Sequence, residues 1–258
     1  MKNCMLGMSI FVLILLLGIN TKHHAETVSG EAEIPSSILE TMDEAIQKEL
    51  IEDPKYIALT FDDGPRKETT ELLLDGLLER GAAATFFVVG EQVYCNEALL
   101  LRMQAEGHQV GNHTYSHQRL LTAEKDTIIE EIQKNNVILQ NILGKEEFWL
   151  RPPYGLIDAS RATLIKTPMI YWTIDPEDWK LLDAEKVTNI VVNQVSDGDI
   201  ILLHDFYPTS VDAALEIIDR LQSQGYIFVT VEELFRIQGV TPKAGVLYAA
   251  PDKTRPLP

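Results

Sequence analysis

The sequence is poor in cysteine and in basic residues, and these two shortages exclude several classes of protein. Only Cys4 and Cys95 occur among 258 residues, so the chain has no disulfide framework. Its 22 Lys and Arg stand against 39 Asp and Glu, a formal net charge of −17. We therefore expect no nucleic acid as a partner, because phosphate binding needs a basic face. With 45% hydrophobic and 24% charged residues, the composition is that of an ordinary globular domain.

The longest apolar run, residues 6–19, is too short for a comfortable membrane span. It follows the positive charge of Lys2, an arrangement typical of an export signal. The stretch behind it is a poor cleavage site, because His23 stands where a small residue is preferred. We predict that residues 1–25 are a signal peptide or an uncleaved N-terminal anchor, which would be the protein's one link to a membrane. The protein is then expected outside the cytoplasm, secreted or associated with the membrane or cell wall.

The remaining chain divides by composition into three parts. Residues 26–53 are polar and acidic and predict a linker with a short helix. Residues 54–240 carry the regular patterns of a single folded domain, in which Cys95 is expected to be a buried, small apolar residue. Residues 241–258, with several Pro and Gly, are predicted to be an irregular C-terminal tail.

Short apolar strands alternate with helical patterns throughout the predicted domain. We expect strands at residues 56–61, 84–89, 108–112, 148–151, 169–174, 199–204 and 226–229. Helices are expected at residues 69–80, 97–106, 123–143, 158–166, 184–195, 211–224 and 231–237. Alternation of this kind predicts a parallel sheet, because each crossover returns the chain to the same end. About seven units favour a closed or nearly closed (β/α) barrel, with an open doubly wound sheet as the alternative.

Polar side chains gather at the C-terminal ends of these strands, where barrel and open-sheet enzymes keep their sites. The first strand ends in Asp62 and Asp63, adjacent carboxylates that point in different directions, so one can bind a metal while the other handles a proton. The strand at 108–112 is followed by His113 and His117, whose i, i+4 spacing on a helical turn is typical of metal ligands. Either motif alone is equally compatible with a solvated turn.

Three more predicted strands end in similar motifs, at residues 151–155, 175–179 and 204–205. Of the four His outside the targeting segment, only His108 does not follow a strand, so it is expected to be structural. Gathered on one face of a barrel, these strand ends would form a metal site surrounded by acids, a base and a cation.

Five motifs occur in order: Thr-Phe-Asp-Asp-Gly-Pro from residue 60, His-Thr-Tyr-Ser-His from 113, Arg-Pro-Pro-Tyr-Gly from 151, Asp-Pro-Glu-Asp-Trp from 175 and Ile-Leu-Leu-His from 201. In these motifs the chain resembles the polysaccharide deacetylases of carbohydrate esterase family four, over residues 55–239. The resemblance implies a distorted (β/α) barrel with about seven parallel strands and a single catalytic domain. It also implies a metal-dependent hydrolase that removes N-acetyl groups from a GlcNAc-containing cell-wall polysaccharide, with peptidoglycan as the first choice.

The resemblance also implies a role for each motif residue. Asp63, His113 and His117 would hold one divalent metal ion, expected to be Zn²⁺. Asp62 would be the base, and Arg151 would orient it and keep its pKa low. His204 would be the general acid, and the carboxylate of Asp178 would raise its pKa. The backbone N–H of Tyr154 would stabilise the oxyanion. Trp179 and Leu202 would wall the acetyl pocket.

Several alternatives stay open from the sequence. The substrate is an N-acetylated polysaccharide in the first reading, but chitin oligosaccharides, an exopolysaccharide or O-acetylated xylan fit the same motifs. A non-catalytic wall-binding protein is the alternative from another class. Asp175 is the second candidate for the carboxylate that pairs with His204, although its neighbour Pro176 favours a structural role. The sequence carries no prediction of oligomeric state.

Overall fold

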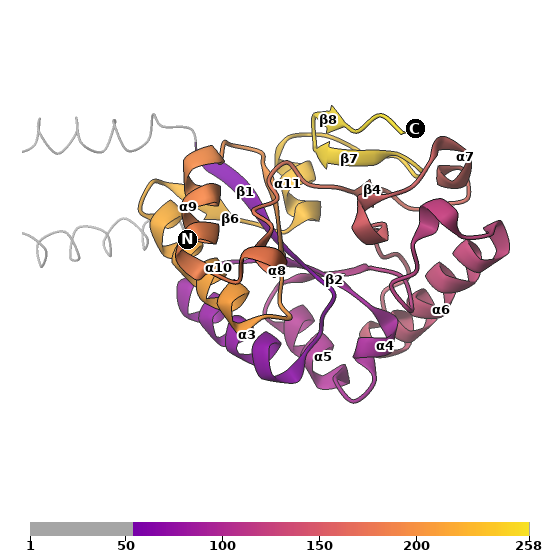
Figure 1. Ribbon diagram of the computed structural model, residues 1–258, viewed down its shortest axis with the longest axis horizontal. Coiled ribbons are helices and arrows are strands. Elements are labelled where there is room, and N and C mark those ends of the chain that lie inside the picture. Colours follow the sequence, from indigo (N-terminus) through magenta and orange to yellow (C-terminus); the bar gives the residue numbers. More distant parts are fainter. Residues whose placement is uncertain (1–53, 258) are drawn as a thin grey trace, which may run out of the picture. The chain divides into compact units, whose positions relative to one another are not determined.

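A computed structural model describes residues 54–257 (Figure 1). The predicted signal or anchor at residues 1–25 and the predicted linker at 26–53 both lie outside the described residues. Within the described residues, no helix combines the length and the apolar character needed to cross a membrane.

The predicted alternation of strands and helices is present. The strands are β1 (Lys55–Asp62), β2 (Thr85–Val88), β3 (Gln109–Asn112), β4 (Met169–Ile170), β5 (Ile200–His204), β6 (Tyr226–Phe228), β7 (Leu247–Ala250) and β8 (Lys253–Thr254). The helices are α3 (Lys67–Arg80), α4 (Gly90–Val93), α5 (Glu97–Ala105), α6 (Lys125–Leu143), α7 (Ala159–Ala162), α8 (Asp178–Leu181), α9 (Ala184–Gln194), α10 (Pro208–Gln222) and α11 (Val231–Ile237). Two 3₁₀ turns, η1 and η2, span Leu120–Thr122 and Pro153–Gly155.

The strands form two sheets with mainly parallel pairing. The larger sheet has the order β3-β2-β1-β5, and β6 pairs with the start of β1. The smaller sheet has the order β4-β7-β8. Single parallel bridges join the two sheets, from Asn112 to Leu150, from Leu150 to Met169 and from Ile174 to Ile201. The parallel α/β class is therefore confirmed, but in the described part of the chain no continuous ladder closes the barrel.

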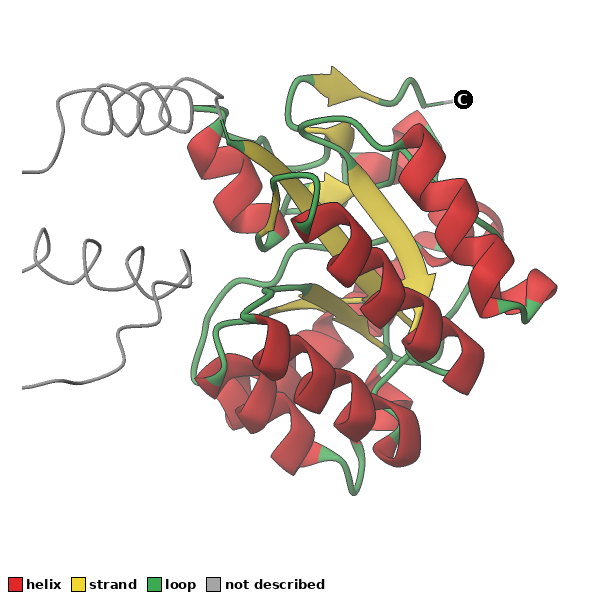
Figure 2. Ribbon diagram, turned by 90° about the vertical axis from the view of Figure 1, so that its left-hand side faces the viewer, coloured by secondary structure: helices red, strands yellow, loops and turns green. Residues whose placement is uncertain are grey.

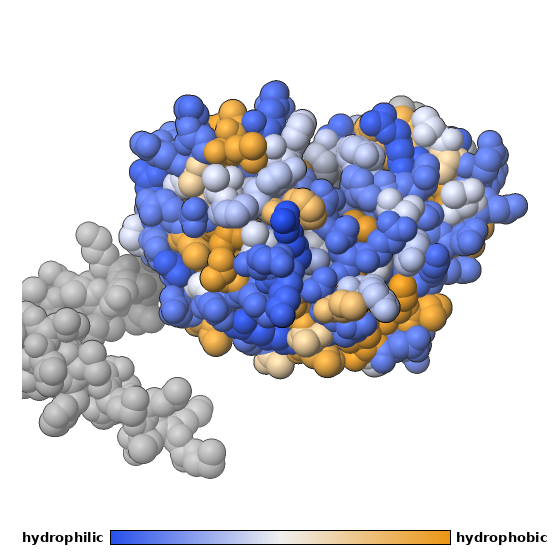
Figure 3. Space-filling view, turned by 60° about the horizontal axis from the view of Figure 1, so that its bottom comes forward, coloured by the Kyte–Doolittle hydropathy of each residue, from blue (hydrophilic) through white to orange (hydrophobic). Residues whose placement is uncertain are grey.

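Helices cover the outside of the strands, as Figure 2 shows. The central strand β1 is buried on both faces from Ile57 to Asp62, which is expected where helices and barrel interior enclose a parallel sheet. Helix α3 directs Leu73 and Leu77 into the same core. The outer surface in Figure 3 is largely hydrophilic, with apolar side chains in separate patches. The fold therefore holds the ends of its strands on a rigid, apolar support.

Three expectations are corrected by the structure. The tail at 241–258 is not irregular throughout, because β7 adds to β4 in parallel and β8 returns antiparallel to β7. Its strands are too short to show a periodic pattern, and their partner β4 lies far away in sequence. Residues 148–151 do not form a strand with a ladder, since Leu150 makes only isolated bridges. Cys95 is exposed rather than buried, because it lies in the short turn between α4 and α5, where the neighbouring Tyr94 is exposed as well.

Candidate metal centre and catalytic site

The two carboxylates at the end of β1 diverge as the sequence predicts. Asp62 is the last residue of the strand and is buried. Asp63 turns the chain with a φ of 73°, a left-handed conformation that Asp tolerates better than most residues. The two neighbouring side chains therefore have different partners: Asp62 contacts an arginine, and Asp63 lies beside two histidines.

Asp63, His113 and His117 converge, with one ligand atom from each lying within 4.8 Å of the others. Oδ1 of Asp63 is 3.5 Å from Nε2 of His113 and 3.3 Å from Nε2 of His117. This Oδ1 atom is buried and has no hydrogen-bond partner in the described structure. A buried, unpartnered carboxylate oxygen facing two imidazoles is what a metal ion would satisfy, so these residues fit a divalent cation.

The orientation and the protonation state of His113 both suit a metal ligand. Its Nδ1 lies 2.7 Å from the carbonyl oxygen of Arg151, which fixes Nδ1 as the protonated donor and leaves the Nε2 lone pair toward Asp63. Burial lowers the pKa of His113 to about 3. The imidazole is therefore neutral at neutral pH, which is the form that binds metal.

The loop that carries the two histidines is not the predicted helical turn. Thr114 and His117 have left-handed φ values of 65° and 59°, so the imidazoles approach each other through an irregular loop. Asn135 of α6 supports that loop: its buried amide donates to the carbonyl oxygens of Val88 and Thr114. Sequence analysis missed Asn135, although an Asn on the otherwise apolar buried face of a helix was an available signal.

Arg151 and Asp62 form a buried ion pair, as the resemblance implies. Nη1 of Arg151 lies 2.8 Å from Oδ1 of Asp62, and the arginine side chain is fully buried. The guanidinium also donates to Oγ1 of Thr60 at 2.7 Å and to the carbonyl oxygen of Tyr171 at 2.8 Å. The expected lowering of the Asp62 pKa is wrong: burial raises the pKa, and the charge of Arg151 offsets this only in part.

His204 ends β5 directly beside Asp62, with which it is paired across β1 and β5. Its Nδ1 lies 2.8 Å from Oδ1 of Asp178, so Asp178 is the partner that the resemblance implies. Burial alone would lower the pKa of His204, but the hydrogen bond and charge of Asp178 raise it to about 9. Asp175 instead accepts the backbone N–H of Glu177 at 2.9 Å, which supports the structural reading of that residue.

The other predicted site residues surround this centre. Tyr154 has a left-handed φ of 62° and is half exposed, and its ring lies 4.7 Å from the ring of His117. Leu202 is buried two residues before His204, on the same face of β5. Trp179 follows Asp178 on α8 and is half exposed. Their positions are compatible with the predicted roles, which remain predictions.

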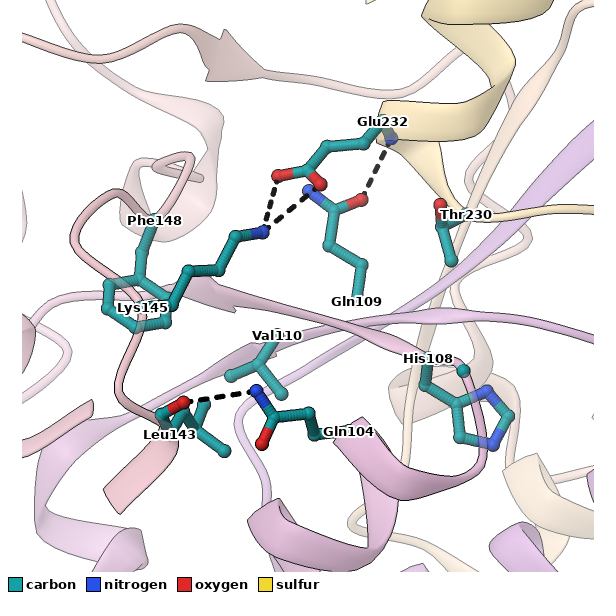
Figure 4. Close-up of a pocket in the computed structure, with 10 residues that line it drawn as sticks. Gln104, His108, Gln109, Val110, Leu143, Lys145, Phe148, Thr230 and Glu232 are labelled. Atoms are coloured by element: carbon teal, nitrogen blue, oxygen red, sulfur yellow. Dashed lines mark hydrogen bonds and ion pairs between the residues drawn. The ribbon is translucent and has the colours of Figure 1, made fainter. Parts of the chain in front are cut away.

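His108 lies away from this centre. It precedes β3, and its Nδ1 accepts the backbone N–H of Ala84. Burial lowers its pKa to about 4, so it is neutral. It lines a separate cavity of about 260 Å³ on which Lys145 and Glu232 form an ion pair (Figure 4). The structural role expected for His108 agrees with this position.

Together the groups provide what hydrolysis of an acyl bond requires. The carboxylate of Asp62 can accept a proton, and the imidazolium of His204 can donate one. The Asp63–His113–His117 cluster lies beside Asp62, since Nε2 of His113 is 3.6 Å from Oδ2 of Asp62. A base, an acid and a set of metal ligands thus meet at one end of the sheet.

Comparisons with known proteins agree with this geometry. A family model described as polysaccharide deacetylase matches residues 50–168. The chain is 42% identical over 196 residues to peptidoglycan-N-acetylmuramic acid deacetylase PdaC of Bacillus subtilis, covering 75% of this chain and 42% of PdaC. It is 37% identical over 187 residues to a peptidoglycan-N-acetylglucosamine deacetylase of Bacillus cereus, covering 70% and 68%.

Solved structures show the same relationship. A structure of PdaC matches with a TM-score of 0.71 and 42% identity, covering 72% of this chain and 93% of that chain. A family 4 acetyl xylan esterase from Clostridium thermocellum, in complex with cobalt, matches with a TM-score of 0.73 and 34% identity, covering 76% and 98%. This chain thus spans less than half the length of PdaC but nearly the whole of the solved domains. It belongs to the polysaccharide deacetylases of carbohydrate esterase family four.

Proposed function

We propose that this chain is a metal-dependent hydrolase that removes N-acetyl groups from a GlcNAc-containing cell-wall polysaccharide, with peptidoglycan as the first choice. The observation that carries the proposal is the meeting of three features. These are the Asp63–His113–His117 cluster, the Asp62–Arg151 pair and the His204–Asp178 pair. A wall-binding protein without turnover would have no use for an acid and a base paired across two strands beside a set of metal ligands.

The proposed chemistry assigns each group one task. Zn²⁺ held by the cluster would polarise the amide carbonyl and make water a better nucleophile. Asp62, held in place by Arg151, accepts the proton of the attacking water, and His204 gives a proton to the departing amine. The backbone N–H of Tyr154 stabilises the oxyanion, and Trp179 and Leu202 enclose the acetyl methyl group.

The choice of polymer rests on the relatives. PdaC and the Bacillus cereus protein are described as peptidoglycan deacetylases, acting on N-acetylmuramic acid and N-acetylglucosamine respectively. The similarity to an acetyl xylan esterase favours O-deacetylation of xylan as a second candidate. A peptidoglycan substrate would place the enzyme outside the cytoplasm, secreted or associated with the membrane or wall, in agreement with the apolar run at residues 6–19.

The test compares substrates under matched conditions. The purified protein is loaded with Zn²⁺ and incubated with peptidoglycan glycan strands, chitin oligosaccharides and acetylated xylan, and released acetate and new free amines are measured. We expect amines from the peptidoglycan strands, little acetate from xylan, and loss of both signals with a chelator. Asp62→Asn is the inactive control. Acetate from xylan alone would establish the second candidate, and no acetate from any of these polymers would refute hydrolysis.

A further inference from the structure

A second cavity, of about 400 Å³, lies at the C-terminal end of β4. Tyr171 and Trp172, which directly follow β4, line it. Lys253 of β8 and Arg255, which directly follows β8, also line the cavity. This size is within the usual range for a site that binds one small molecule or one sugar residue. The cavity therefore depends on the C-terminal segment that the sequence leaves without a role.

Direct contacts connect this cavity to the reacting centre. The carbonyl oxygen of Tyr171 accepts a hydrogen bond from Nη2 of Arg151, whose Nη1 pairs with Asp62. Gly155, the neighbour of Tyr154, packs so closely on Tyr171 that a Cβ there would lie 2.2 Å from Cε2 of the ring. The cavity and the reacting centre are thus connected through Arg151 and through the Tyr154–Gly155 segment.

The cavity carries positive charge in a chain that is otherwise strongly acidic. Its lining holds two cations, Lys253 and Arg255, and a single carboxylate, that of Asp175. Neither cation takes part in an ion pair formed within residues 54–257. The guanidinium of Arg255 stacks over Tyr171, 3.7 Å from the ring centroid, and Tyr171 in turn stacks on Trp172. This stacking fixes the plane of the guanidinium and leaves its N–H edge available to a bidentate acceptor.

We propose that this cavity is a subsite for a carboxylate-bearing part of the substrate next to the sugar that is deacetylated. The inference rests on the proposed function and narrows it to an acidic glycan. In peptidoglycan the carboxylate has two sources: the lactyl group of muramic acid residues without a peptide, and the peptide attached to that group. Arg255 and Lys253 bind the carboxylate, and the stacked Tyr171 and Trp172 support the face of the cavity behind it.

The experiment compares acidic and neutral glycans in matched variants. Lys253→Gln with Arg255→Gln removes both cations, and Lys186→Gln with Arg236→Gln removes two exposed cations elsewhere. KM and binding affinity are measured for neutral chitin oligosaccharides, for peptide-free muramic acid glycans and for peptide-bearing glycans. We expect the ratio of KM for acidic to KM for neutral glycan to rise about tenfold in the first double variant only. The single variant Arg255→Lys, which keeps the charge, should retain part of the preference for acidic glycans. Added salt should weaken this preference in the wild type.

The glycans separate the possible outcomes. A preference only for peptide-free glycan assigns the lactyl carboxylate, and a preference only for peptide-bearing glycan assigns the peptide. An equal ratio in the wild type and the Lys253/Arg255 variant, with turnover of neutral oligosaccharides intact, would overturn the subsite. No turnover of any glycan would instead count against the proposed function, and binding measured without turnover would still decide whether the two cations recognise a carboxylate.

Discussion

Asp178 holds His204 at two points. Its Oδ1 lies 2.8 Å from the ring Nδ1, and its Oδ2 accepts the backbone N–H of His204, also at 2.8 Å. The ring is therefore fixed in orientation, and Nε2 remains as the nitrogen that can give a proton to the substrate. The same contacts connect α8 to the end of β5.

The first prediction follows from the pKa of His204, raised to about 9. We expect kcat/KM to fall as pH rises through about 9, because His204 loses the proton that it donates. The stabilisation of the fold by the His204–Asp178 pair should be complete below the free histidine pKa of about 6.5. It should be lost as pH rises through about 9. Asp178→Asn should move the upper limb of the pH–rate profile to lower pH with metal content unchanged. An unmoved upper limb would show that Asp178 does not set this pKa.

The second prediction concerns the metal cluster. Asp63→Ala should abolish binding of one Zn²⁺ per chain, because it removes the anionic ligand between the two imidazoles. Zn²⁺ should raise the melting temperature of the wild type but not of this variant. Elemental analysis and calorimetric titration measure the binding, and Asp212→Ala on the exposed face of α10 is the matched control. Stoichiometric Zn²⁺ in Asp63→Ala would rule out this ligand set.

The third prediction separates charge from geometry at Arg151. Arg151→Lys keeps a cation but cannot reach Asp62, Thr60 and Tyr171 together, so activity should fall by about 10²-fold or more. Because the guanidinium is fully buried, the free energy of unfolding should also drop by about 2–4 kcal/mol. Denaturant unfolding and steady-state kinetics measure the two effects. Wild-type stability in this variant would contradict the buried contacts.

The fourth prediction concerns the backbone at Gly155, which has a φ of 63°. Gly155→Ala would strain this conformation and push the Cβ against Tyr171. The shift would displace the adjacent Tyr154 and its backbone N–H, so kcat should fall while Zn²⁺ stays bound. Gly144→Ala, at a left-handed position with open space around it, controls for backbone strain alone. Equal effects of the two substitutions would show that the contact with Tyr171 is unimportant.

Much of the site was predictable, because the carboxyl ends of parallel strands meet at one edge. That rule brought Asp62, His113 and His204 together from motifs far apart in sequence. The loop conformation between His113 and His117 was not predictable, because non-glycine residues with positive φ leave no mark in the sequence. The pKa of Asp62 was also beyond reach, since it depends on burial as well as on its partner.

The fold was least predictable where short segments pair over long sequence distances. Strand β4 has two residues and β8 has two, too few for any alternation of side chains to show. Pairing of β4 with β7 depends on a contact between segments about eighty residues apart, and only tertiary packing decides it.

Arg151 contributes both to the proposed catalysis and to the stability of the fold. Its guanidinium bonds Thr60 and Asp62 of β1 and the carbonyl oxygens of Ile170 and Tyr171 at β4. It therefore ties the larger sheet to the smaller one, in addition to the single bridges and the shared apolar core between them. A homologue that has lost catalysis would still be stabilised by these contacts of Arg151. Retention of Arg151 alone is thus poor evidence that a homologue is active. Loss of Asp63, a proposed metal ligand, or of His204, the proposed proton donor, is the more informative sign.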